Sequence, residues 1–83
     1  MNIELYYAPH CPRCHRVRQR VARLCAERGL ALMERNVLEH LAQAAALGIR
    51  ATPSLVIDGR LAASGTLEES VLQRLLTPKE SPP

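Results

Sequence analysis

The 83-residue sequence predicts a single α/β domain, a four-stranded mixed sheet flanked by helices in the order β-α-β-α-β-β-α. Two patterns predict it: strand-forming runs alternate with segments of helical periodicity, and an Asp-Gly pair separates two apolar runs near the end of the chain. A chain of this length holds one domain at most. We expect that domain over residues 1–77 and a flexible, proline-rich tail over residues 78–83.

The first half of the chain predicts two strands and two helices. Residues 3–7, with the sequence IELYY, form the first expected strand. From Pro12 the apolar side chains recur at three- and four-residue steps, which indicates one face of a helix that ends at Gly29. Proline suits the first helical position because its missing N–H is not needed there. Residues 31–37 indicate a second strand, and the alanine-rich residues 39–48 a second helix.

The second half of the chain predicts a hairpin and a third helix. Asp58 and Gly59 stand between the runs LVI and RLAA, and this pair accepts the positive φ angles of a tight turn. Thr66 followed by Glu69 has the spacing of a capping box, so we expect the last helix to begin at Thr66. Helices join the first three strands, which favours parallel pairing among them, whereas the final hairpin is antiparallel.

Cys11 and Cys14 stand three positions apart in the segment APHCPRCHRV. Cys11 falls at the expected helix N-terminus, where partial positive charge and free N–H groups stabilise a thiolate and lower its pKa. Cys14 lies one turn further on, within reach of a disulfide to Cys11 but facing the core. This spacing predicts that Cys11 attacks a target disulfide and Cys14 resolves the mixed disulfide. We expect His10 to contribute modestly to the electrostatics of Cys11.

The strand, the Cys-Pro-x-Cys that opens a helix and the Thr-Pro that precedes a hairpin together resemble the glutaredoxin and small thioredoxin-like redox-disulfide family, over nearly the whole chain. The resemblance implies a thioredoxin-like fold and a thiol–disulfide oxidoreductase whose only cofactor is its own dithiol, with Cys11 and Cys14 as the catalytic residues. It also implies that Pro53 is cis and faces the cysteines, and that the Thr52 backbone pairs with a bound substrate chain. The expected substrate-binding residues are Thr52, Pro53, Pro12, Arg13, His10 and Gly65.

The sequence departs from the glutaredoxin pattern at three places. Arg13 replaces the usual tyrosine between the cysteines, Ala8 replaces a basic residue, and a single Gly65 stands where glutaredoxins tend to show Gly-Gly. The implied substrates are disulfide-containing proteins or small molecules. Either glutathione or a flavin-dependent reductase would be the electron donor.

A Cys-x-x-Cys motif can also serve other chemistries. The letters CPRCH match a c-type haem attachment sequence, but the alternating strands and helices differ from the helical wrap of small cytochromes. Structural zinc needs four ligands, and His10, Cys11, Cys14 and His15 are too clustered to surround one ion, so we expect no metal site. The main alternative is a thioredoxin-fold module that binds a metal or a protein partner without turnover.

Composition limits the partners and the compartment. The net charge is +3 with few aromatics, so we expect no nucleic-acid partner. No signal peptide and no long apolar run are recognisable. We therefore expect a cytoplasmic location and no association with a membrane. Cys25 lies on the apolar helix face and is expected to be a buried hydrophobe. A stripe of arginines is either a solvated helix face or steers acidic partners toward the dithiol; its members are Arg13, Arg16, Arg20 and Arg23.

Overall fold

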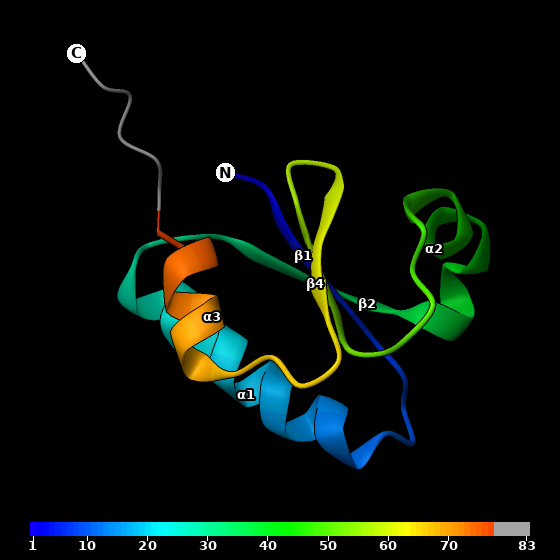
Figure 1. The fold of residues 1–83 in the computed structure, drawn as a ribbon, viewed down its shortest axis with the longest axis horizontal. Coiled ribbons are helices and arrows are strands. Elements are labelled where there is room, and N and C mark those ends of the chain that lie inside the picture. The colour runs from blue at the N-terminus through cyan, green and yellow to red at the C-terminus, as the bar shows by residue number, and fades with distance from the viewer. Residues whose placement is uncertain (78–83) are drawn as a thin grey trace.

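Four strands form one mixed sheet in the order β2-β1-β3-β4 in the computed structural model, which describes residues 1–77 (Figure 1). The expected order of elements is confirmed, and the tail expected over residues 78–83 lies outside the described residues. The strands are β1 Ile3–Tyr7, β2 Leu32–Asn36, β3 Ser54–Ile57 and β4 Arg60–Ser64. The helices are α1 Pro12–Glu27, α2 Leu41–Leu47 and α3 Glu69–Leu75, with a 3-10 turn, η1 Val37–Glu39, before α2.

The two faces of the sheet carry separate apolar clusters. Successive side chains of β1 point to opposite faces, so Ile3 and Leu5 pack on one side and Tyr6 on the other. Helices α1 and α3 lie side by side over the first face (Figure 1). The second face is smaller, with Ala44 of α2 packed near Tyr6 and Val56. The buried residues of the first face are Ile3, Leu5, Val17, Val21, Leu24, Cys25, Leu55, Leu67, Leu72 and Leu76.

Helix α1 runs where the periodicity predicts it. Pro12 occupies its first turn, and its buried side chains, among them Cys14, Val17 and Val21, recur at three- and four-residue steps. The backbone leaves the helix just before Gly29, whose φ of 66° is one that glycine adopts readily. Because the buried stripe holds α1 against the sheet, its N-terminus is fixed at the point where the chain arrives from β1.

The predicted hairpin is confirmed. Asp58 and Gly59 have φ angles of 51° and 79°, the positive values that a two-residue hairpin turn requires. The Asp58 carboxylate also accepts a hydrogen bond from the Asn2 N–H at 2.7 Å, and the Asp58 N–H donates to the Asn2 carbonyl at 2.8 Å. These bonds tie the turn to the start of the chain, at the end of the sheet opposite Pro53.

The expected parallel pairing of the first three strands is wrong for β3. β1 and β2 are parallel, but β3 runs antiparallel to β1, with Ser54 opposite Tyr6. A helix of seven residues is about 10 Å long, whereas a five-residue strand spans about 17 Å. Helix α2 therefore does not carry the chain back along the sheet. With η1 it turns the chain at one end, and β3 enters from the end where β2 stops.

The expected start of the last helix at Thr66 is also wrong. Leu67 is buried, with 1% of its surface exposed, and its carbonyl accepts a hydrogen bond from Arg20 Nη1 at 2.6 Å. Glu68 is still extended, with φ −67° and ψ 153°, and α3 begins at Glu69. The Glu69 carboxylate pairs with Arg23 instead of closing a capping box. Burial of Leu67 thus overrides the local capping signal.

The late start of α3 predicts a large loss of stability for one of two neighbouring substitutions and almost none for the other. Leu67→Ala should lower the free energy of unfolding by about 2–5 kcal/mol, because it empties a buried site. Thr66→Ala should change it by less than about 0.5 kcal/mol, because Thr66 caps no helix. Urea unfolding of both variants checks this. A loss of about 1 kcal/mol in Thr66→Ala, as expected for a true N-cap, would contradict the structure.

Candidate active site

Cys11 occupies the N-cap position of α1, as the sequence predicts. Its backbone is extended, with φ −99° and ψ 110°, and the helix starts at the next residue. The Cys11 Sγ accepts a hydrogen bond from the Cys14 backbone N–H at 3.2 Å. A serine or aspartate oxygen does the same at ordinary helix N-caps. The same Cys14 N–H also donates to the Cys11 carbonyl at 3.1 Å, so the sulfur and the carbonyl share this donor of the first turn.

The two thiols of the motif differ in acidity. The pKa of Cys11 lies below its ordinary value, chiefly because the Cys14 side chain hydrogen-bonds to its sulfur. The Cys14 N–H, the Thr52 side chain and the Arg13 backbone act in the same direction, against partial desolvation. Burial, with Cys14 only 1% exposed, raises the pKa of the Cys14 thiol. The structure thus holds a half-exposed sulfur disposed to ionise beside a buried one disposed to stay protonated.

The Thr52–Pro53 peptide bond is cis, as the resemblance implies. Pro53 is fully buried at the start of β3, and the Thr52 carbonyl accepts a long hydrogen bond from Arg13 Nη2 at 3.5 Å. The Gly65 N–H donates to the Pro53 carbonyl at 2.8 Å, and Gly65 has a φ of 82°. These contacts bring the start of α1, the loop before β3 and the segment after β4 together.

A buried serine that no sequence pattern predicts supports this loop. Ser54 is fully buried, and its hydroxyl donates to the Ala51 carbonyl at 2.6 Å. The same hydroxyl shares a hydrogen bond of 2.9 Å with the Ser64 hydroxyl on β4. Nothing in the periodicity sets Ser54 apart from an ordinary strand residue. Its contacts fix the loop of Thr52 and Pro53 to both strands of the hairpin.

The remaining predicted residues lie around the dithiol with different exposure. Pro12, Arg13 and His10 are exposed, and Gly65 is half-buried. Cys25 is buried in the core, as expected, with 2% of its surface exposed. All three cysteines are free thiols. The roles expected for His10 and Gly65 in substrate binding stay predictions.

The described residues show neither a metal-binding cluster nor a membrane-spanning helix. Within residues 1–77, no three His, Cys, Asp or Glu side chains come together as a group that could hold a metal ion. Across the same residues, no helix has both the length and the apolar character needed to cross a membrane.

A groove of about 360 Å³ adjoins the cysteine motif. We call it the arginine groove; it is lined by Pro12, Arg13, Arg16, Val17, Arg20 and Thr66. The sequence pointed to Pro12 and Arg13 as site residues but gave no signal for Thr66, because the capping pattern assigned it to a helix. The arginine stripe is also divided: Arg23 does not line the groove and instead pairs with Glu27 and Glu69.

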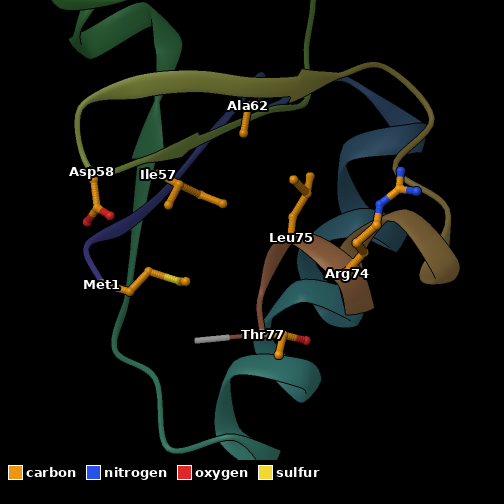
Figure 2. Close-up of a pocket in the computed structure, with 7 residues that line it drawn as sticks. All are labelled: Met1, Ile57, Asp58, Ala62, Arg74, Leu75 and Thr77. Atoms are coloured by element: carbon orange, nitrogen blue, oxygen red, sulfur yellow. The ribbon is translucent and has the colours of Figure 1, made fainter. Parts of the chain in front are cut away.

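A larger hollow of about 660 Å³ contains none of the predicted site residues. Figure 2 shows that its lining comes from the hairpin, the end of α3 and the N-terminus. The lining residues are Met1, Ile57, Asp58, Ala62, Arg74, Leu75 and Thr77. The volume of a cavity therefore does not locate the active site. We assign the active site to the dithiol on the basis of its hydrogen bonds.

Known proteins resemble this chain over most of its length. A family model described as the thioredoxin domain matches residues 1–77. A probable thioredoxin of Archaeoglobus fulgidus is 30% identical over 76 residues, which cover 89% of this chain and 84% of that protein.

Solved structures give the same result. A mutant thioredoxin from Halobacterium salinarum has a TM-score of 0.76 and 28% identity, covering 89% of this chain and 69% of its own. NrdH-redoxin from Escherichia coli, a glutaredoxin-like protein described as having a thioredoxin-like activity profile, has a TM-score of 0.64 and 25% identity. That match covers 96% of this chain and 100% of its own. The expected thioredoxin-like fold is confirmed.

The unequal thiols predict unequal alkylation. In reduced protein, iodoacetamide should modify Cys11 well before Cys14 and Cys25, because the lowered pKa keeps more of Cys11 as thiolate. The Cys11 rate should rise with pH in a range below that of a free thiol, and the Cys14 rate in a range above it. Trypsin cleaves after Arg13, so mass spectrometry assigns each cysteine to its own peptide.

Free cysteine alkylated in parallel gives the reference curve, and the Cys11→Ser variant should retain only the slow reactions. Equal rates for Cys11 and Cys14, or a Cys11 curve that coincides with free cysteine, would contradict the assignment.

Proposed function

The chain belongs to the thioredoxin-domain family, and on that premise we propose that it is a disulfide reductase that works through Cys11 and Cys14. Thiol–disulfide exchange is the general activity of this family. The observation that carries the proposal is the hydrogen bond from the Cys14 N–H to the Cys11 sulfur at the N-terminus of α1. It supports Cys11 as the attacking thiolate, because the thiolate is the reactive species in disulfide exchange.

In the first step the Cys11 thiolate attacks one sulfur of the substrate disulfide. A new S–S bond forms between Cys11 and that sulfur, the substrate S–S bond breaks, and the second substrate sulfur leaves as a thiolate. Cys14 does not compete for the substrate, because burial keeps it protonated and out of reach. An attacking thiol works best when its pKa lies near ambient pH, since a lower pKa also reduces nucleophilicity.

In the second step Cys14 releases the product. The Cys14 thiol gives its proton to the departed thiolate or to water, and its sulfur attacks the Cys11 sulfur. The Cys11–Cys14 disulfide forms and the mixed disulfide breaks. The substrate sulfur that was bonded to Cys11 leaves as a thiolate. The substrate has then gained two electrons and the protein has lost two. The only cofactor in this scheme is the cysteine pair itself.

The substrate chain is proposed to lie across Thr52 and Pro53. These residues end the loop that faces the start of α1, and Arg13 reaches the Thr52 carbonyl only at the long limit of a hydrogen bond. A substrate backbone can therefore displace Arg13 from that carbonyl at little cost. His10, Pro12 and Gly65 complete the rim of this surface in the proposal.

The electron donor is proposed to be a flavin-dependent reductase of the thioredoxin type rather than glutathione. Two observations support this choice. The sequence lacks the tyrosine, the basic residue and the Gly-Gly of the glutaredoxin pattern, at positions that hold Arg13, Ala8 and Gly65. The glutaredoxin-like NrdH-redoxin, similar over nearly the whole chain, is described by its thioredoxin-like activity profile. A reducing cytoplasm suits such a role, since it keeps the pair as a dithiol.

The mechanism predicts distinct outcomes for the two cysteines. Cys11→Ser should abolish catalysed reduction of insulin, because the attacking sulfur is gone. Cys14→Ser should accumulate a covalent mixed disulfide with the substrate, visible by mass spectrometry, because no sulfur remains to resolve it. Cys25→Ser is the matched control and should retain turnover. Turnover that survives in Cys11→Ser would exclude the mechanism, and wild-type protein without turnover would favour the binding-module alternative.

The donor assignment is tested separately. Oxidised protein should be reduced faster by NADPH with a thioredoxin reductase than by glutathione at physiological concentration, as followed by NADPH absorbance and by trapping of free thiols. A protein reduced readily by glutathione and left oxidised by the reductase would reverse the assignment while leaving the roles of Cys11 and Cys14 intact.

A further inference from the structure

Three arginines of α1 gather on one side of the helix, in the arginine groove. Arg13, Arg16 and Arg20 follow one another at steps of three and four residues, so they lie along one helix face. At a rise of 1.5 Å per residue they span about 10 Å along the axis. That span corresponds to about three residues of an extended polypeptide.

The charges of these arginines are not neutralised by carboxylates of the described chain. Arg13 and Arg20 donate to backbone carbonyls, those of Thr52 and Leu67, and Arg16 is exposed. Other arginines of the same fold do pair with acids: Arg18 with Glu34, Arg23 with Glu27 and Glu69, and Arg35 with Glu4. Within residues 1–77, the three arginines of the groove beside the dithiol therefore form no ion pair with a carboxylate.

The groove is continuous with the reactive centre. Pro12, at one end of its lining, follows Cys11 directly in the chain, and Thr66 follows Gly65, whose N–H bonds to the Pro53 carbonyl. Arg13 lies between the cysteines and contacts Thr52. A polypeptide whose disulfide reaches Cys11 would place the residues beside its cysteine along these arginines.

We propose that the arginine groove binds an acidic segment that flanks the reactive cysteine of the substrate polypeptide. The inference rests on the proposed function and names the class of substrate. Guanidinium groups bind carboxylates in a planar, two-pronged geometry, and three of them in line select for several acidic residues in succession. The lining holds no aromatic side chain on which a base could stack, so a polypeptide fits it better than a nucleic acid.

Three peptides of equal length test the proposal, and the first two also have the same composition. Each carries one cysteine as a mixed disulfide with 2-thiopyridine, whose release is followed by absorbance. Glutamates flank the cysteine in the first peptide and stand at the far end in the second, while glutamines replace them in the third. The wild-type kcat/KM should be highest for the flanking peptide, by about 1.5- to 5-fold for each arginine engaged. This preference should fall toward one at about 1 M salt, where the Debye length is about 3 Å.

Arginine variants locate the effect. Arg16→Ala should reduce the flanking-to-distant ratio of kcat/KM by about 1.5- to 5-fold, Arg16→Glu should reduce it further because it adds a repulsive charge, and Arg16→Lys should retain most of it. Arg60→Ala is the matched control, because Arg60 is exposed at the hairpin turn, at the opposite end of the sheet from Pro53. Its ratio should equal that of the wild type.

Equal rates for the flanking and distant peptides would show that overall charge alone steers the substrate, and would overturn the proposal. A flanking-to-distant ratio in Arg16→Glu that equals the wild-type ratio would also overturn it. In both cases the peptides are still reduced, so the disulfide reductase activity stands. Failure to reduce any of the three peptides would instead overturn the proposed function itself.

Discussion

The arrangement of the active site depends on one hydrogen bond, from the Cys14 N–H to the Cys11 sulfur. The bond exists because α1 begins at Pro12 and its first turn directs the Cys14 N–H toward both the sulfur and the carbonyl of Cys11. Together with the Cys14 side chain, which lowers the pKa of Cys11 most, this N–H stabilises the thiolate. The contacts that hold α1 against the sheet therefore also hold both donors beside the sulfur. The buried stripe of α1 thus serves the chemistry as well as the core.

The position of the dithiol could be predicted from the sequence because its determinants are local. Pro12 marks the start of α1, the apolar steps that follow mark its buried face, and the Asp58-Gly59 pair marks the hairpin turn. Each of these signals lies within a few residues, and no contact with a distant residue overrides it in the folded chain.

The sequence-based predictions are wrong where contacts between distant residues decide the direction of a strand or the start of a helix. The direction of β3 depends on whether α2 is long enough to return along the sheet, and the alanine-rich pattern does not show that η1 takes part of the segment. Leu67 is drawn into the core and Arg20 binds its carbonyl, which a capping pattern cannot reveal. The sequence does not predict the arginine groove for the same reason, because Arg20 and Thr66 are far apart in the chain and line it together only in the folded protein.

The third cysteine has a consequence of another kind. Cys25 is 2% exposed, and burial raises its pKa, so oxidants and alkylating reagents reach it only when the core opens. It sits near the end of α1, whereas the reactive pair sits at the beginning. Slow labelling of Cys25 in the native protein therefore reports transient opening of the distal half of this helix, and the molecule carries its own probe of local unfolding.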